Sequence, residues 1–129
     1  MFKKLVMLIA FFLFSHFAIA EMKLEEVIDY DCRFNRKACA AASEVKAAVK
    51  AASSKYGVDP LLLLSIIREE SKFRPLARSS SSHGLAQVNS HYHLKKFEGK
   101  SIYDIAKNVD VGASILKYCI NRKKGNVSK

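Results

Sequence analysis

The feature that most constrains the fold is a strongly apolar helix predicted to begin at Pro60. Asp59 can accept the free N–H groups of a first helical turn, and Pro60 stands where its missing N–H costs nothing. The run Leu61–Leu64, followed by Ile66 and Ile67, makes the segment apolar almost all round. A helix of this kind is expected to be buried at the centre of a domain, with the other elements packed around it.

Two neighbouring carboxylates, Glu69 and Glu70, follow at the end of this helix, and helical spacing separates their surroundings. Glu70 comes four residues after Ile66 and prolongs an apolar stripe, whereas Glu69 stands beside Arg68. A carboxylate that ends an apolar stripe is expected to be partly desolvated, which keeps it protonated long enough to act as an acid. The alternative is that both are exposed charges at a helix end, since charged residues are mostly exposed.

The residues after Glu70 form a spaced pattern. It consists of Glu70-Ser71, Phe73, Pro75, Ala77, Ser79 and Gly84-Leu85-Ala86-Gln87-Val88, and later of Asn108, Gly112, Ile115-Leu116 and Gly125-Asn126. The pattern resembles the E-S-x-F-x-P-x-A-x-S…G-L-M-Q signature and the later N-x-x-x-G-x-x-h-L…G-N helix of soluble-lytic-transglycosylase (SLT) domains, which are peptidoglycan-cleaving relatives of goose-type lysozyme. The resemblance runs from about Tyr56 to the C-terminus. It implies a mainly α, lysozyme-like fold.

The resemblance implies that Glu70 is the catalytic residue of a peptidoglycan lytic transglycosylase. Glu70 would protonate the leaving oxygen of the MurNAc–GlcNAc β-1,4 bond and then, as a base, take the proton of the MurNAc 6-hydroxyl, which closes a 1,6-anhydro ring. One acid fits this reaction, whereas ordinary glycosidases use two carboxylates. Glu69 is only a neighbour on the helix, and Asp104 and Asp110 look like helix caps. No metal and no organic cofactor is implied.

Four residues are predicted to bind the glycan beside Glu70: Ser71 and Gln87 of the pattern, and Asn89 and Tyr92 that follow it. Gln87 can hydrogen-bond the saccharide or orient Glu70, and Asn89 can line the groove. Tyr92 can stack on a sugar ring, as amphipathic aromatic side chains do. An alternative stays open, in which Ser71 and Gln87 are ordinary hydrogen-bonding residues that do not touch the substrate.

The resemblance also implies where the sugar cleft lies. The polar loop Ser79–His83 and the segment Gly84–Val88 would form its floor and wall. The loop is shorter than is usual in the family, and Ala86 stands where Met is common, which enlarges the wall. His91 and His93 are expected to be solvated loop residues, since polar side chains are mostly exposed.

The N-terminus has the pattern of a secretory signal peptide. Lys3 and Lys4 supply a positive start, Leu5 to Phe17 an apolar stretch, and Ala18-Ile19-Ala20 a small-residue cleavage site. The apolar run is shorter than the roughly 20 residues that a membrane span needs. The protein is therefore expected to be exported to the periplasm or the extracellular space, without stable membrane insertion after cleavage of residues 1–20.

The charge of the chain is strongly basic, with a formal net charge of +10. A basic exported protein suits an anionic wall polymer, because long-range attraction steers the two together. Nucleic acid would suit the charge equally well, but the sequence has no zinc-finger, helix-turn-helix or basic-plus-aromatic strand pattern. The expected partner is therefore peptidoglycan glycan strands and not nucleic acid, with a secretion, conjugation or phage apparatus as a further candidate.

The expected organisation is a signal peptide, a polar lead-in with little regular structure at 21–39, and a lysozyme-like transglycosylase domain at 40–129. The domain is predicted to open with an amphipathic helix, Ala40 to Tyr56, that Gly57 ends. Val45, Ala48, Val49, Ala52 and Tyr56 recur there at helical spacing.

The C-terminal part is predicted to hold two further helices. The Ser101–Asp104 stretch reads as a capping box that opens a short helix to about Lys107. A longer helix is predicted over roughly Val109 to Lys123, with Val111, Ile115, Leu116, Cys119 and Ile120 turned inward. Gly125 is expected to cap it.

Cys32, Cys39 and Cys119 allow three different disulfide pairings, and export makes one of them plausible. The sequence does not choose among the three. No cysteine stands in a recognisable nucleophile setting. The spacing of Cys32 and Cys39 to His91 or His93 does not support a zinc site.

The sequence stops at Lys129, before an A-x-x-Y-N-x-G motif that follows the Gly-Asn stretch in relatives. The expectation is either a product truncated at its C-terminus or a chain that functions without this wall, with part of the cleft missing, lower stability, and weak or absent activity. Two other functions are therefore kept beside the transglycosylase: a non-catalytic wall-binding or secretion-apparatus component, and a lysozyme-like hydrolase that uses water. The 1,6-anhydro end of the product distinguishes the two enzymes.

Overall fold

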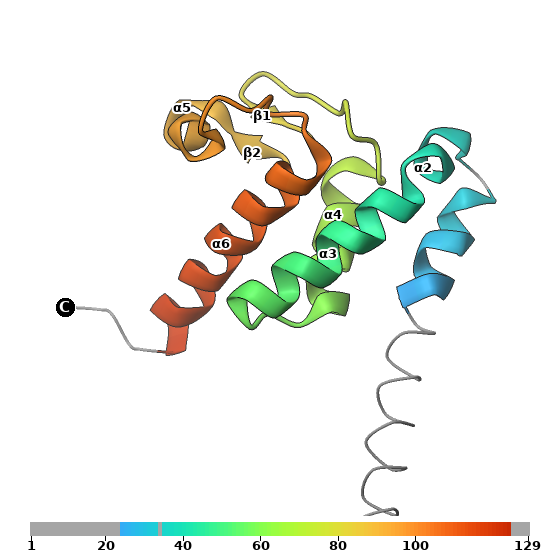
Figure 1. The fold of residues 1–129 in the computed structure, drawn as a ribbon, viewed down its shortest axis with the longest axis horizontal. Coiled ribbons are helices and arrows are strands. Elements are labelled where there is room, and N and C mark those ends of the chain that lie inside the picture. The colour runs from blue at the N-terminus through green and yellow to red at the C-terminus, as the bar shows by residue number, and fades with distance from the viewer. Residues whose placement is uncertain (1–23, 34, 125–129) are drawn as a thin grey trace, which may run out of the picture.

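The structure, a computed structural model, describes residues 24–33 and 35–124 (Figure 1). Two expectations fall outside these residues, the signal peptide at 1–20 and the Gly125-Asn126 end of the family pattern. Within the described ranges, no helix has both the length and the apolar character that crossing a bilayer requires.

The described chain is mainly α-helical. A first helix over residues 24–32, which carries no label in Figure 1, is followed by α2 (Arg36–Ala40), α3 (Ala42–Tyr56), α4 (Pro60–Ser71), α5 (Ser90–His93), the 3-10 helix η1 (Leu94–Phe97) and α6 (Ile105–Lys124). A short antiparallel hairpin joins β1 (Ser82–His83) to β2 (Val88–Asn89), with Ser82 opposite Asn89 and His83 opposite Val88. The predicted mainly α, lysozyme-like fold class is confirmed.

The helices surround α3 and α4, which lie together in the middle of the molecule (Figure 1). The helix α6 runs along α3 on one side, and the first helix and α2 lie on the other. The hairpin, α5 and η1 form a cap at one end of α6. This cap and the end of α4 carry most of the residues predicted for the site.

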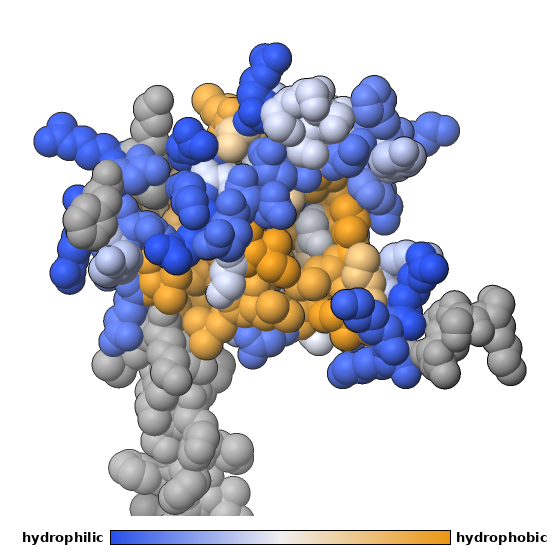
Figure 2. Space-filling model, turned by 180° about the vertical axis from the view of Figure 1, so that it is seen from behind, coloured by the Kyte–Doolittle hydropathy of each residue, from blue (hydrophilic) through white to orange (hydrophobic). Residues whose placement is uncertain are grey.

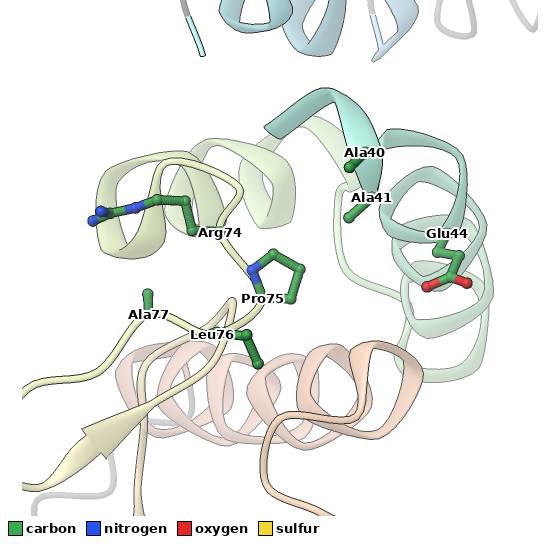
Figure 3. A pocket seen from close by; sticks show the side chains of 7 residues that line it. All are labelled: Ala40, Ala41, Glu44, Arg74, Pro75, Leu76 and Ala77. Carbon is green, nitrogen blue, oxygen red and sulfur yellow. The ribbon is translucent and has the colours of Figure 1, made fainter. Parts of the chain in front are cut away.

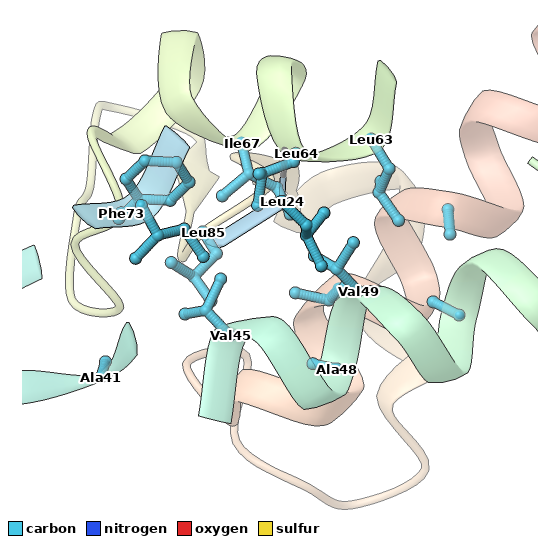
Figure 4. Close-up of a cluster of buried hydrophobic side chains, with 14 of the residues drawn as sticks. Leu24, Ala41, Val45, Ala48, Val49, Leu63, Leu64, Ile67, Phe73 and Leu85 are labelled. Carbon is cyan, nitrogen blue, oxygen red and sulfur yellow. The ribbon is translucent and has the colours of Figure 1, made fainter. Parts of the chain in front are cut away.

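The core forms where the apolar faces of α3 and α4 meet. Leu63, Leu64 and Ile67 of α4 point toward Val45 and Val49 of α3 (Figure 4), and all five are buried. Leu24, Ile28, Phe73, Leu85 and Val109 complete this core from the neighbouring segments. Burying a large apolar side chain stabilises the fold by about 1.5–3 kcal/mol, so the α3–α4 contact is a major source of stability.

The start of α4 is as predicted, but its burial is one-sided. Asp59 caps the helix, because its Oδ1 accepts a hydrogen bond from the backbone N–H of Leu62 at 2.8 Å. The Leu62 side chain, however, is 43% exposed, and Leu61 and Ile66 are half-buried. Figure 2 shows a broad apolar area in the middle of the face turned away from the view of Figure 1. The expectation of a helix buried all round is therefore wrong.

The end of α4 is set by two residues in the left-handed backbone region. Lys72 has φ of 51° and Phe73 has φ of 57°, values that side chains other than Gly rarely adopt. The Phe73 ring is fully buried, so its packing holds the chain in this strained turn. The helix ends at Ser71, well before Pro75, as the sequence predicts.

The expected lead-in with little regular structure is instead helical and part of the core. Leu24 and Ile28, four residues apart, lie on one helical face and are buried against the core. Asp31 near the end of this helix binds Arg68 of α4, with Nε to Oδ2 at 2.6 Å and Nη2 to Oδ1 at 3.3 Å. Lys46 of α3 forms a second ion pair, with Glu25. The spaced apolar residues and two ion pairs thus hold in place a segment whose polar composition suggested little regular structure.

The C-terminal part also differs from expectation. A single helix, α6, replaces the two predicted ones, and Asp104 rather than Ser101 caps it. The Asp104 Oδ1 atom accepts from the backbone N–H of Lys107 at 2.8 Å. The Ser101 hydroxyl accepts from the N–H of Tyr103 at 3.1 Å, which makes a local turn and not a capping box.

Asn108 joins α6 to the segment that carries the hairpin. Its side chain is fully buried, and its Oδ1 accepts from the backbone N–H of Ala86 at 2.8 Å. Its Nδ2 donates to the carbonyls of His83 at 3.0 Å and Ile102 at 2.8 Å. Gly84 has φ of 78°, and a Cβ atom there would lie 2.3 Å from the Asn108 Nδ2. The amide therefore needs glycine at that position.

Replacing Asn108 by Ala is expected to lower the free energy of unfolding by about 3 kcal/mol, because each buried backbone group left without a partner costs about 1–3 kcal/mol. Urea denaturation followed by circular dichroism measures the loss. Asn121→Ala, at an exposed position of the same helix, is the control and should change stability by less than about 0.5 kcal/mol. Equal losses in the two variants would contradict the anchoring role.

Candidate active site

Glu70 lies in the last turn of α4, and its side chain is exposed. The expected partial desolvation of this carboxylate is therefore wrong. Helical spacing does place Glu70 in line with Ile66 and Ile67, but the side chain projects past the packed part of the helix and meets solvent. An exposed carboxylate is open to a polymeric substrate, which can itself exclude water when it binds.

The two carboxylates at the end of α4 have different neighbours. Glu69 lies 4.0 Å from Arg68 and 3.7 Å from Lys72, so two cations surround it. Within residues 24–33 and 35–124, the Glu70 carboxylate takes part in no ion pair or hydrogen bond. Negative charge at a helix C-terminus is unfavourable by about 0.3–1 kcal/mol, so Glu70 is not placed there to stabilise the helix.

A groove of about 330 Å³ runs between α4, α6 and the hairpin segment. It is lined by Leu63, Ile66, Ala86, Gln87, Val88, Asn89, His93, Gly112, Ile115, Leu116 and Cys119. Leu63 and Ile66 stand seven and four residues before Glu70, on the same face of α4. Glu70 is not part of the lining itself. It stands one helical turn past Ile66, which does line the groove.

Two of the predicted glycan-binding residues, Gln87 and Asn89, lie in this groove. Gln87 adopts φ of 48°, and its Nε2 donates to the carbonyls of Ala77 at 3.1 Å and Gly84 at 3.0 Å. Asn89 caps α5, because its Oδ1 accepts from the N–H of His91 at 3.0 Å. Both amides thus have fixed orientations, and the Gln87 Oε1 atom has no hydrogen bond from the described residues that would occupy it.

The other two predicted glycan-binding residues do not line the groove. Ser71 is buried, and its hydroxyl donates to the carbonyl of Ile67 at 2.9 Å, so it supports the end of α4. This matches the alternative in which Ser71 is an ordinary hydrogen-bonding residue. Tyr92 is 81% exposed on α5 and contacts the edge of the His93 ring. Tyr92 lies on open surface.

The sequence interpretation missed His93. This residue was expected to be a solvated loop residue, but it is half-buried in α5 and lines the groove beside Asn89. Its Nδ1 atom is buried and has no hydrogen-bond partner among the described residues. The signal for it was Asn89 followed by Ser90, a good start for a short helix, in which His93 is the fourth residue.

Arg68, in the last turn of α4, forms an ion pair with Asp31 of the first helix. The Asp31 carboxylate, by hydrogen bonding and by its charge, raises the pKa of the Arg68 guanidinium above its ordinary value. Arg68 also lies on the Glu69 side of the helix. The pair therefore fixes the first helix against α4 and keeps a cation beside Glu69, away from the groove.

Two other pockets are less suited to catalysis than the groove. One of about 450 Å³ is lined by alanines, Pro75, Leu76, Glu44 and Arg74, and the Arg74 side chain points away from Glu44 (Figure 3). Another of about 260 Å³, between α3 and α6, contains Lys55 and Asp110, which neutralise each other at 2.8 Å. In the part of the chain that the structure describes, no three His, Cys, Asp or Glu residues are grouped to hold a metal ion. The groove beside α4 is the better candidate site.

Comparison with known protein families gives a match that covers most of this fold. The family described as the transglycosylase SLT domain matches residues 47–129, from the second turn of α3 onward. The chain belongs to this family, as the residues around Glu70 predicted. Its function is of the lytic-transglycosylase type, and peptidoglycan is the substrate that the family implies. No solved structure is a significant match to the chain.

The floor of the groove depends on a close contact between Gly112 of α6 and Ala86. A Cβ atom at Gly112 would lie 2.5 Å from the Cβ of Ala86, closer than two carbon atoms can approach. The family pattern has Gly at this helical position, and the contact explains why. Because Gly112 has no side chain, the segment that carries Ala86 packs directly against α6.

Gly112→Ala is expected to lower the free energy of unfolding by about 1 kcal/mol, because the clash outweighs the better helix propensity of Ala. In an Ala86→Gly background the same change should raise it, by up to about 1 kcal/mol, since the clash is gone. Chemical denaturation of the four proteins of this cycle measures both effects. A stabilising Gly112→Ala change in the natural background would show that the contact is loose.

Proposed function

We propose that the protein is a lytic transglycosylase in which Glu70 acts first as general acid and then as general base. The observation that supports this most is the exposed carboxylate of Glu70, which stands one helical turn past Ile66, a residue that lines an apolar groove together with Leu63. Glu69, the neighbouring acid, is engaged with two cations on another face. Of the two acids at the end of α4, Glu70 is thus the one that combines exposure with a carboxylate free of ion pairs among the described residues.

The proposed reaction breaks the MurNAc–GlcNAc β-1,4 bond without water. Protonated Glu70 gives its proton to the glycosidic oxygen as the bond from C1 to that oxygen breaks. The N-acetyl group of the same MurNAc stabilises the cation that develops at C1. Ionised Glu70 then takes the proton of the MurNAc 6-hydroxyl, whose oxygen bonds to C1 and closes the 1,6-anhydro ring. The carboxyl group ends protonated, as it began.

An exposed carboxylate needs the substrate to complete its environment. A glycan strand lying along the groove covers Ile66 and the end of α4, and so removes water from the Glu70 carboxylate. Removing water favours the protonated form of a carboxyl group, which is the form that the first step uses. We thus expect the Glu70 carboxylate to be desolvated in the complex with the glycan, and not in the protein alone.

The groove supplies polar groups for orienting the glycan. We assign the Gln87 Oε1 to hydrogen bonding with a sugar hydroxyl or amide, since both Nε2 bonds of Gln87 go to backbone carbonyls. The unpartnered Nδ1 of His93 is a second candidate partner. Ile115 and Leu116 form an apolar wall that suits the methyl groups of N-acetyl and lactyl substituents. Export, which the pattern at residues 1–20 supports, would bring the protein to this polymer.

Glu70→Gln is expected to lower the rate of muropeptide release from purified peptidoglycan at least about 100-fold, because general acid–base catalysis contributes roughly 10²–10⁴-fold. The measurement is mass spectrometry of soluble products after incubation with the purified protein. Glu69→Gln is the matched control, with the same change at the adjacent position, and should release products at close to the parent rate. Glu70→Gln as active as the parent would show that the assignment is wrong.

The product masses distinguish the alternatives. A lytic transglycosylase yields 1,6-anhydroMurNAc ends, which are lighter by one water than the reducing ends that a lysozyme-like hydrolase yields. If reducing ends are released and their release depends on Glu70, the reaction is hydrolysis at the same site and not transglycosylation. Binding to peptidoglycan without any released product would favour a non-catalytic wall-binding component.

A further inference from the structure

The structure brings two of the three cysteines into contact. The Cys39 thiol donates a hydrogen bond to the backbone carbonyl of Cys32, with 3.1 Å between Sγ and O. The two residues are seven positions apart in the sequence, so the chain between the first helix and α2 has to turn back sharply. The bond brings the Cys39 sulfur next to the Cys32 backbone.

The turn between these helices is held by backbone hydrogen bonds. The N–H of Arg33 donates to the Tyr30 carbonyl at 3.3 Å, and the N–H of Asn35 donates to the Asp31 carbonyl at 3.0 Å. The N–H of Cys39 then donates to the Asn35 carbonyl at 3.4 Å. These bonds join the end of the first helix to the start of α2. They keep the two cysteines close to each other before any covalent bond forms.

Cys119 is placed apart from this pair. It lies on α6, is exposed, and lines the groove together with Leu63 and Ile66 of α4. Cys32, the last residue of the first helix, instead packs against the core. In the described part of the chain no hydrogen bond links Cys119 to Cys32 or Cys39. Of the three pairings that the sequence allows, the geometry favours one.

We propose that Cys32 and Cys39 form an intramolecular disulfide that clasps the first helix to α2, and that Cys119 stays a free thiol. The bond closes the turn next to Asp31, whose carboxylate binds Arg68 two residues before Glu70. The clasp therefore restrains the helix that supports the end of α4. It is independent of the proposed catalytic reaction.

The oxidant is another disulfide, and the exchange takes two steps. The exposed Cys39, as thiolate, attacks one sulfur of the oxidant and releases the other as a thiolate, which leaves a mixed disulfide on Cys39. The Cys32 thiolate then attacks the Cys39 sulfur, forms the intramolecular bond and releases the second thiolate. Two protein thiols are oxidised, one disulfide is reduced to two thiols, and the protons of the protein thiols pass to solvent or to the released thiolates.

The order of attack follows from the surroundings of Cys32. Desolvation, hydrogen bonding with the Cys39 thiol and nearby acidic groups raise the pKa of Cys32 to about 11, from the ordinary 9.0. This lowers its thiolate fraction about 100-fold, while the higher basicity makes the thiolate about tenfold more nucleophilic, so Cys32 reacts about tenfold more slowly than an ordinary exposed thiol. Cys39 is therefore the first to react with an external disulfide.

The bond is tested by peptide mapping of the full chain after oxidation with oxidised glutathione. Free thiols are blocked with iodoacetamide, and the protein is digested with trypsin without reduction. Trypsin cuts after Arg33, Arg36 and Lys37, so the expected product is peptide 24–33 linked to peptide 38–46, with Cys119 alkylated in peptide 118–122. A linked peptide that contains residues 118–122, or glutathione on Cys39 without the cross-link, would overturn the proposal.

Serine variants test the clasp and the order of reaction. Cys119→Ser should keep the cross-link, and in it, as in the parent, reduction should lower Tm by roughly 10 °C. Cys39→Ser should show no such shift, and its Cys32, still partly buried and beside Asp29 and Asp31, should take up glutathione more slowly at neutral pH than Cys39 does in Cys32→Ser. Equal Tm in the oxidised and reduced parent would show that the bond does not restrain the fold. Equal rates in the two variants would contradict the order of attack.

Discussion

The buried amide of Asn108 is the interaction on which the arrangement of the site most depends. Three backbone groups, from Ala86, His83 and Ile102, meet at this one side chain in α6. The hairpin is only two residues long on each strand, so its own ladder cannot hold it in place. The amide supplies that restraint and so sets the position of one wall of the groove relative to the other.

Spacing in the sequence was enough to predict the parts of the fold that depend on one helix at a time. Asp59 and Pro60 mark the start of α4, Gly57 ends α3, and the apolar stripe of α3 is buried as expected. The family could be identified because Glu70 and its neighbours occupy fixed intervals in the sequence. These are local properties, and they survive folding because neighbouring elements do not change them.

Properties that depend on two or more elements could not be predicted in the same way. The first helix looked polar, yet Leu24 and Ile28 are buried because α3 and α4 present a matching apolar face. The exposure of Glu70 depends on what covers the end of α4, and the burial of Ser71 depends on a hydrogen bond within the last turn. His93 was missed for the same reason, since only the fold places α5 beside the groove.

The end of α4 combines a backbone held by the apolar core with an exposed Glu70 side chain. Phe73 holds a strained turn that ends the helix directly after the two carboxylates. Because the helix stops there, Glu70 can extend past the packed core while its backbone stays rigid. A rigid backbone with an open side chain is a suitable arrangement for a residue that has to meet a long polymer.

The burial of Leu24 has a consequence for the biogenesis of the protein. This side chain is 3% exposed and stands only four residues after the predicted cleavage point that follows Ala20. Peptidases act on chain that is accessible and extended, and a docked helix offers neither close to its first turn. On the prediction that residues 1–20 are a cleaved leader, its removal would precede docking of the first helix against the core.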